Sequence, residues 1–315
     1  MKLSIKLHSQ NISRQKMASR RYTRSKFGDV FIFVMLAAAG LFTMLPLIYA
    51  VCTSFKPLDE LLIFPPRFFV RRPTLGNYLI LPDLMASLRI PLSRYIFNSL
   101  MVTIVATFFY IIISAMAAFV LSKATFKGRN VLFWTIQFAL MFNTYTLAVP
   151  QYLIFSKMQI IDTYWVYILP HMASTLGVFL MKQYIEGYIP DALLEAARID
   201  GAGDMRILFT IILPLSKSIL ATVALWTAVA NWNSWFPCLL YIRDTDKYVL
   251  QVILRRIILD GSSEFVNMEV SNMSEPTTEA IKAATTIVTI LPIILVYPFL
   301  QKYFVQGVMV GSLKG

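Results

Sequence analysis

Long apolar runs alternate with short polar segments along this chain. Each run is about as long as the roughly 20 residues that a helix needs to cross the hydrocarbon core of a bilayer. The six runs are residues 30–52, 97–121, 131–155, 164–181, 219–240 and 283–303. The first run is too long for the apolar part of a signal peptide, and no A-x-A cleavage site follows it, so we expect a retained helix. The pattern predicts an all-α integral membrane protein with six transmembrane helices.

Composition agrees with the apolar pattern. The 315 residues are 57% hydrophobic and only 15% charged, and the mean hydropathy is +0.64. A soluble domain would carry about 25% charged residues. Cys52 and Cys238 fit no metal or redox spacing, so we interpret them as small buried hydrophobic residues, with a disulfide between them as the alternative.

The distribution of basic residues predicts which side of the membrane each segment faces. Residues 1–28 contain eight Lys or Arg and no acid, and the loop after the second run carries Lys123, Lys127 and Arg129. Basic segments of this kind remain in the cytoplasm. Both termini are therefore expected to be cytoplasmic, and the loop 53–96 is expected outside despite its own small basic excess. The basic tail is expected to contact anionic membrane lipid. A nucleic-acid-binding arm is the alternative explanation for a net charge of +12, and we expect no nucleic-acid partner.

One polar stretch with many small residues, 188–220, interrupts the apolar runs. Pro190 suits the first turn of a helix, and Asp191 complements the positive end of the helix dipole. Gly201 follows where a short helix needs a left-handed terminating residue. A second segment then continues until about Pro214, which cannot extend a helix. We therefore expect a short helix that ends at Gly201, on the cytoplasmic side.

The spacing within this stretch is specific. The triplet Glu195-Ala196-Ala197, then Gly201 and, after nine intervening residues, Ile211, Leu213 and Pro214 resembles the EAA motif of ABC-importer permeases. In that family the motif forms a cytoplasmic coupling helix that docks into a groove on the ATP-binding subunit. The resemblance implies that the ATPase contacts are Leu194, Glu195, Ala196, Ala197, Asp200, Gly201 and Ala202. An ordinary amphipathic loop helix is the alternative.

Other segments extend the resemblance from residue 30 to residue 315. The fragments SFKPLDEL, FPP, PTLGNY, RYIFNSL and NWNSWFPCLLYI, and the ending QGVMVGSLKG, are similar to carbohydrate permeases of the maltose-permease G-like kind, closest to the oligosaccharide and polysaccharide subgroup. The resemblance implies the type I ABC importer permease fold. It also implies that Gly311, Ser312 and Lys314 of the C-terminal tail reach the ATPase interface, although a frayed terminus is the alternative.

These considerations divide the chain into four parts. Residues 1–28 form the basic cytoplasmic tail, and 29–96 form the first helix and the outer loop. Residues 97–303 form a five-helix permease core that includes the coupling loop 186–214, and 304–315 form the cytoplasmic C-terminal tail.

Polar side chains within the apolar runs are candidates for a substrate path, because polar groups at membrane depth are costly unless they face protein or water. Amides and aromatic rings together suit a sugar, which offers hydroxyls and apolar C–H faces. The candidates are Asn143, Tyr145, Asn231, Trp232, Asn233 and Trp235. The alternative is that these side chains hold helices together or mark the membrane interface. We interpret His171 as a helix-contact histidine, because no second metal ligand lies at a suitable spacing.

The absence of two sequence features excludes some classes of function. No G-x-x-x-x-G-K-[ST] sequence occurs, so this chain does not bind ATP through a P-loop, and no run carries a central carboxylate that could couple entry to protons or sodium. We therefore expect no catalytic residue, bound cofactor or metal in this chain, and ATP and Mg²⁺ in the partner ATPases.

The resemblance implies a bacterial cell-membrane permease that imports a sugar, with three kinds of partner: a second permease, two P-loop ATPases and an extracellular or periplasmic sugar-binding protein. An importer for another solute is one alternative. A membrane-embedded transferase would need a carboxylate pair, for which only Asp59/Glu60 and Asp244/Asp246 are close in sequence. A passive channel would leave the coupling motif unexplained.

Overall fold

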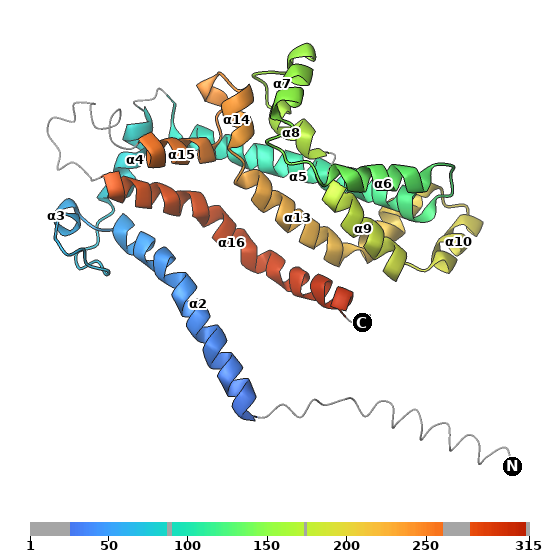
Figure 1. Cartoon of the computed structure of the whole chain (residues 1–315), viewed down its shortest axis with the longest axis horizontal. Helices are drawn as coiled ribbons and strands as arrows, with labels where there is room; N and C mark the ends of the chain where they lie inside the picture. The colour runs from blue at the N-terminus through green and yellow to red at the C-terminus, as the bar shows by residue number, and fades with distance from the viewer. Residues whose placement is uncertain (1–25, 87–89, 173–174, 261–277, 313–315) are drawn as a thin grey trace. The chain divides into compact units, whose positions relative to one another are not determined.

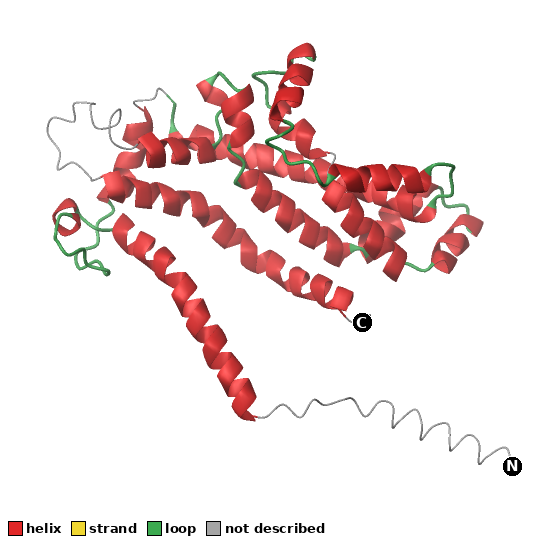
Figure 2. Cartoon of the chain, in the orientation of Figure 1, coloured by secondary structure: helices red, strands yellow, loops and turns green. Residues whose placement is uncertain are grey.

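The computed structural model describes residues 26–86, 90–172, 175–260 and 278–312, with residues 26, 83–86, 260, 278 and 299–312 described by their backbone alone. Within these ranges the chain is helical and contains no strand (Figures 1 and 2). The chain divides into two units, residues 1–51 and 52–315. The expected all-α class is confirmed.

The helices differ widely in length. The bounds are α2 (Lys26–Ser54), α3 (Leu58–Leu61), α4 (Gly76–Ala86), α5 (Leu92–Lys123), α6 (Arg129–Ala139), α7 (Ala148–Lys157), α8 (Trp165–Met172), α9 (Thr175–Tyr188), α10 (Asp191–Ile199), α11 (Asp204–Ile207), the π-helical turn η1 (Leu208–Ile212), α12 (Leu213–Leu215), α13 (Lys217–Trp232), α14 (Phe236–Tyr241), the 3₁₀ turn η2 (Thr245–Lys247), α15 (Leu250–Asp260) and α16 (Thr278–Ser312).

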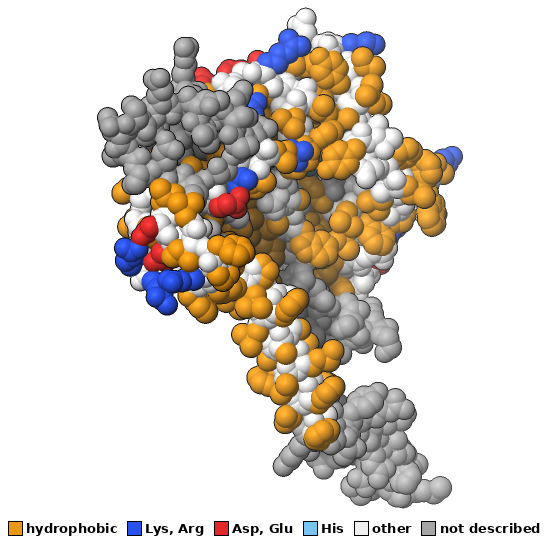
Figure 3. Space-filling model, turned by 60° about the vertical axis from the view of Figure 1, so that its left-hand side comes forward, with side chains coloured by type: hydrophobic (Ala, Val, Ile, Leu, Met, Phe, Trp, Pro, Cys, Tyr) orange, Lys and Arg blue, Asp and Glu red, His pale blue; other side chains and the backbone are white. Residues whose placement is uncertain are grey.

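Three described helices are long and apolar enough to cross a membrane. They comprise Phe27–Ser54, Leu92–Lys123 and Glu279–Pro298. Hydrophobic side chains cover the length of α2 in Figure 3. A fourth span is possible if Asp204–Leu215 and Lys217–Trp232, which meet at an angle of 83°, are taken as one broken segment. The protein is therefore a multi-pass membrane protein.

The third apolar run differs from the expectation of a single helix. The run 131–155 is split between α6 and α7 by turns at residues 140–147, which include Asn143 and Thr144. The run 164–181 begins in α8 and ends in α9, residues 173–174 between them lie outside the described residues, and Pro170 lies inside α8. Apolar composition alone did not reveal the interruption at residues 140–147, because polar turn residues such as Asn143 and Thr144 lower the mean hydropathy of a long window only slightly.

Helix α5 organises the second unit. It contacts α8, α9 and α13, while α13 also contacts α16 (Figure 1). One core cluster surrounds the first half of α5 and includes Tyr95, Tyr241 and Leu250. Another surrounds its second half and includes Phe119 and Met181. Apolar packing thus fixes the two ends of α5 to different sets of helices.

Close packing between α5 and α9 depends on Gly177. A Cβ atom built on Gly177 would lie 2.6 Å from Cε1 of Tyr110 and 2.8 Å from Oγ of Ser114. Small residues at such contacts let two helix backbones approach closely inside a membrane. Any larger residue here must push α9 away from α5 or displace the Tyr110 ring.

A buried amide joins three segments at the first half of α5. Asn98 Nδ2 donates to the carbonyl oxygens of Asp246 at 2.8 Å and Tyr248 at 2.9 Å. Its Oδ1 accepts from the Tyr164 hydroxyl at 2.9 Å, and Ser99 Oγ accepts from the Leu250 amide at 2.8 Å. These bonds attach the segment around η2 and the chain before α8 to α5. Both cysteines are free, so they form no disulfide.

Candidate functional site

The helix that carries the EAA triplet, α10, has defined ends. Pro190 adopts an extended conformation immediately before the first helical residue, one position earlier than we expected. At the other end Gly201 has a φ of +81°. The Ala202 amide donates to the Ala197 carbonyl at 2.9 Å, and the Gly201 amide donates to the Arg198 carbonyl at 3.0 Å. This pair of bonds is the glycine-terminated arrangement that satisfies the last carbonyls of a helix, so the expected end at Gly201 is confirmed.

Only one face of α10 is buried. Leu194 is 4% exposed and belongs to the core cluster that includes Ile189 and Ile207. Its side chain therefore holds α10 to the protein, which differs from the expectation of a surface contact. The other expected contact residues divide by exposure: Glu195, Ala196, Asp200 and Gly201 are exposed, whereas Ala197 and Ala202 are half-buried.

Exposed apolar side chains border the same surface. Ile199, Met205 and Leu193 are 86%, 59% and 40% exposed. Sequence reasoning did not select them, although an apolar residue at 199, five positions after the buried Leu194, falls on a different face of the helix and was a usable signal. An exposed surface of small, charged and apolar residues is the composition that a docking partner would cover.

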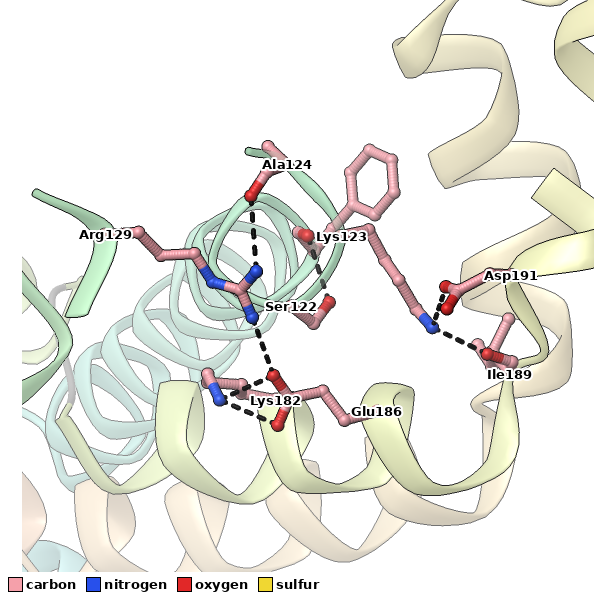
Figure 4. Close-up of polar contacts among 9 residues, drawn as sticks. Ser122, Lys123, Ala124, Arg129, Lys182, Glu186, Ile189 and Asp191 are labelled. Atoms are coloured by element: carbon pink, nitrogen blue, oxygen red, sulfur yellow. Dashed lines mark hydrogen bonds and ion pairs between the residues drawn. The ribbon is translucent and has the colours of Figure 1, made fainter. Parts of the chain in front are cut away.

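A lysine from α5 anchors the start of α10. Lys123 Nζ donates to the carbonyl oxygen of Ile189 and to Oδ1 of Asp191, both at 2.7 Å (Figure 4). The hydrogen bond from Lys123, together with its charge, holds the pKa of Asp191 below its usual range. One ammonium group thus fixes both the backbone before α10 and the first side chain of the helix.

A second polar bridge lies beside this anchor. Glu186, on α9, accepts from Lys182 Nζ at 2.7 Å on both carboxylate oxygens and from Arg129 at 3.0 Å (Figure 4). The Lys182 ammonium also lies 4.3 Å from the centre of the Phe133 ring. Because Lys182 is buried, the Glu186 carboxylate and the Phe133 ring replace water around its ammonium group. The bridge connects α6 to α9 directly before the chain enters α10.

The segment after α10 changes direction. Arg198 and Asp204 form an ion pair at 3.2 Å across the Gly201 turn. The π-helical turn η1 directly precedes Pro214, and α13 then departs at 83°. Pro214 has no N–H to donate to the carbonyl four residues earlier, and its ring crowds that carbonyl, so a widened turn here has a local cause.

A cavity of about 870 Å³ is lined by residues of α5–α9, α13 and α14 and of the turns at residues 140–147. Five of the six side chains selected as a possible substrate path line it: Asn143, Tyr145, Asn231, Asn233 and Trp235. Trp232 differs, because its ring is buried and its Nε1–H donates to the Thr289 carbonyl of α16 at 3.0 Å. His171, which we expected only at a helix contact, also lines the cavity.

The cavity lining combines aromatic rings with uncharged polar groups. The aromatic residues are Tyr110, Tyr145, Trp226, Trp235, Phe236 and Tyr241. Its lining residues include no Asp, Glu, Lys or Arg. Oδ1 of Asn231 is buried and has no hydrogen-bond partner among the described residues. Such a surface can stack against apolar faces and exchange hydrogen bonds with hydroxyl groups.

The acidic pairs that a transferase would need are engaged elsewhere. Glu60 accepts from the backbone amides of Arg71 at 3.0 Å and Arg72 at 2.8 Å, and these hydrogen bonds lower its pKa. Asp244 forms an ion pair with Lys247 at 2.9 Å, and the hydrogen bond from Lys247 lowers the pKa of Asp244. These contacts give both carboxylates a structural role in loops.

The C-terminal candidates lie at the limit of the described chain. Gly311 and Ser312 are in the last turn of α16, where only the backbone is described, and Lys314 lies outside the described residues.

Known proteins resemble this chain over most of its length. The family model described as "Binding-protein-dependent transport system inner membrane component" matches residues 111–310. The polygalacturonan/rhamnogalacturonan transport system permease protein YtcP of Bacillus subtilis (strain 168) is 31% identical, and the match covers 93% of this chain and 100% of that protein. Protein LplC of the same organism is 34% identical over 91% of this chain and 95% of its own length. A crystal structure of a bacterial ABC transporter involved in the import of the acidic polysaccharide alginate contains a chain that is 27% identical, with a TM-score of 0.76 over 89% of this chain and 98% of that one.

Proposed function

Because this chain belongs to the family of binding-protein-dependent transport inner-membrane components, we propose that it is the permease subunit of an ATP-driven importer that moves an oligosaccharide into a bacterial cell. The main structural support for this mechanism is that helix α10 is anchored on one side and exposed on the other. Its buried side is fixed to α5 by Leu194 and by the hydrogen bonds from Lys123, and its other side is open to a partner.

In this proposal α10 is the coupling helix, and an ATPase subunit covers Glu195, Ala196, Ala197, Asp200, Gly201 and Ala202. Small residues let the partner approach closely, and Glu195 supplies a charge-assisted hydrogen bond. The exposed side chains of Leu193 and Ile199 add apolar contact area at the edge of this surface. ATP and Mg²⁺ bind to the partner subunits, and Gly311, Ser312 and Lys314 extend toward them.

Six spans in a type I importer arrangement are part of the same proposal. The broken pair α6–α7, the consecutive helices α8 and α9, and the bent segment α11–α13 then complete a set with α2, α5 and α16. This arrangement places both termini and α10 on the cytoplasmic side. The polar contacts at residues 140–147 and the 83° bend support the idea that these segments line a path instead of facing lipid along their whole length.

The aromatic and amide lining of the cavity supports a sugar as the transported solute. YtcP and the alginate transporter are named for polysaccharides or their import, which favours an oligosaccharide within the family. A second permease would close the cavity from the remaining side, and an extracellular or periplasmic binding protein would deliver the sugar. An importer for another solute is the alternative.

Two experiments test this function. The detergent-solubilised chain is expected to co-purify with a second permease and a P-loop ATPase, identified by mass spectrometry. Glu195→Ala should then abolish ATP-driven sugar uptake while the complex keeps hydrolysing ATP and the chain keeps its unfolding temperature, because exposed substitutions change stability little. Lys127→Ala, an exposed change on the loop before α6, is the matched control. Full uptake by Glu195→Ala would contradict the coupling role.

A further inference from the structure

The cationic side chain of Arg255 lies at the edge of the cavity. The Arg255 guanidinium carbon, on α15, lies 3.8 Å from the ring centre of Trp235, and Trp235 lines the cavity. One turn earlier on the same helix, Gln251 donates to Oδ1 of Asn233, another lining residue, at 3.3 Å. Residues 251 and 255 share a face of α15, so this face borders the cavity.

The charge of Arg255 is not balanced within the described part of the chain. Neighbouring cations have partners: Lys247 pairs with Asp244, and Arg256 donates to the Tyr248 hydroxyl at 3.2 Å. Arg255 is exposed and forms no ion pair or hydrogen bond with a described residue. The cavity lining also contains no carboxylate that could compete for it.

Stacking on an aromatic ring orients a guanidinium group without using its N–H donors. The ring contacts the face of the planar group, so the five N–H groups remain available at its edge, where they match the two oxygens of a carboxylate. Trp235 therefore reduces the conformational freedom that Arg255 would lose on binding. A neutral sugar could accept hydrogen bonds from this group but could not balance its charge.

We propose that Arg255, oriented by Trp235, selects carboxylated oligosaccharides, such as chains of uronic acids, at the edge of the cavity. The cavity volume lies near the upper end of the roughly 300–1,000 Å³ typical of ligand pockets, so it has room for a chain of sugars. This inference specifies the kind of sugar in the proposed function. It rests on that proposed function, because the function is what identifies the cavity as a sugar site.

Trigalacturonate and its fully methyl-esterified form are suitable probes, because they share the sugar skeleton and differ in charge. Each probe carries a fluorophore at the reducing end and is titrated by fluorescence anisotropy against the full chain, with its co-purifying partners, in lipid nanodiscs. The acid is expected to bind on the order of tenfold more tightly than the ester, as for loss of a hydrogen bond to a charged group. Arg255→Gln should reduce this preference to about one, mainly by weakening binding of the acid.

Two control variants separate local recognition from other effects. Arg243→Gln removes the same charge from an exposed loop position near Asp162 and should leave the preference unchanged. Arg255→Lys keeps the charge but loses the planar fork, and should retain only part of the preference.

The inference is overturned if the wild-type chain binds both probes equally or binds neither, or if Arg255→Gln keeps the preference or weakens both probes alike. Failure of the proposed function would instead appear as the absence of an ATPase partner or of ATP-driven uptake, which this binding assay does not measure.

Discussion

Lys123 and Asp191 lie 2.7 Å apart, Nζ to Oδ1, although 68 positions separate them in the chain. The lysine is the last residue of α5, and the aspartate begins α10. The side chain of Lys123 is only 8% exposed, whereas that of Asp191 is 75% exposed. One buried ammonium group therefore holds the start of α10 to the end of α5, in addition to the packing of Leu194.

Replacing this ammonium should loosen α10 without unfolding the protein. Lys123→Met keeps the length of the side chain but leaves the Ile189 carbonyl and the Asp191 carboxylate without their donor. Backbone amides of residues 191–195 are expected to exchange with deuterium several-fold faster, measured by mass spectrometry. Lys127→Met, on the exposed loop before α6, should leave exchange there unchanged. Equal exchange in Lys123→Met and wild type would show that Leu194 alone holds the helix.

The same pair makes the stability depend on acid pH. The folded-state pKa of Asp191 is lowered by Lys123, so its stabilising contribution is present above the ordinary carboxyl pKa of about 3.9 and is lost as pH falls through the lowered value. Asp191→Asn should have a lower unfolding temperature than wild type between about pH 5 and 8, and the two unfolding temperatures should converge as the pH falls from about 4 through the lowered pKa of Asp191. Differential scanning fluorimetry in detergent measures both curves. Asp200→Asn, at the opposite end of α10, is the matched control and should show no such convergence.

The two glycines after α10 should respond differently to alanine. Gly201 has a φ of +81°, which a side chain disfavours, so Gly201→Ala is expected to cost about 1–2 kcal/mol and to fray the end of α10. Gly203 has a φ of −72° and open space around its Cα, so Gly203→Ala should change stability by less than about 1 kcal/mol. Thermal unfolding together with deuterium exchange at residues 196–202 tests the contrast, and equal losses in both variants would count against it.

Two glycines of α9 give another matched pair of variants, which tests the packing between α5 and α9. Gly177→Ala places a methyl group against the Tyr110 ring and Ser114, and overpacking of this kind costs about 1–3 kcal/mol. Gly187→Ala, on the same helix, meets nothing within 4 Å and should be neutral or slightly stabilising, since alanine favours helix formation. The unfolding midpoints of the two variants, measured in detergent, test this difference in stability. A Gly177→Ala protein as stable as wild type would mean that α9 can move away from α5 without cost.

Sequence patterns predicted the structural elements that are determined by residues close together in the chain. The apolar run 97–121 corresponds to α5, and the glycine at 201 ends α10 because left-handed backbone geometry is a property of that residue. Relationships that depend on distant segments could not be obtained in this way. Nothing in the run around Trp232 shows that its indole donates to the Thr289 carbonyl while Trp235 lines the cavity.

The periodicity of apolar residues separates the faces of a helix but does not identify which face packs against the rest of the protein. For this reason Leu194 was expected on the docking surface, whereas it lies in the core. Lys123 was assigned only to a basic cytoplasmic loop, because its contacts with Ile189 and Asp191 depend on how α5 and α9 pack. Whether the surface of α10 meets an ATPase stays a prediction.

The hydrogen bonds of Asn98 restrict which substitutions the protein can accept. Its amide group donates twice to carbonyl oxygens and accepts once from a hydroxyl, all within a buried site. Aspartate has nearly the same shape, and a single base change in an asparagine codon produces it. Its carboxylate, however, would place negative charge against the carbonyls of Asp246 and Tyr248 and offer them no proton. An aspartate that arises by this single base change would therefore repel the segment around η2, which Asn98 holds to α5.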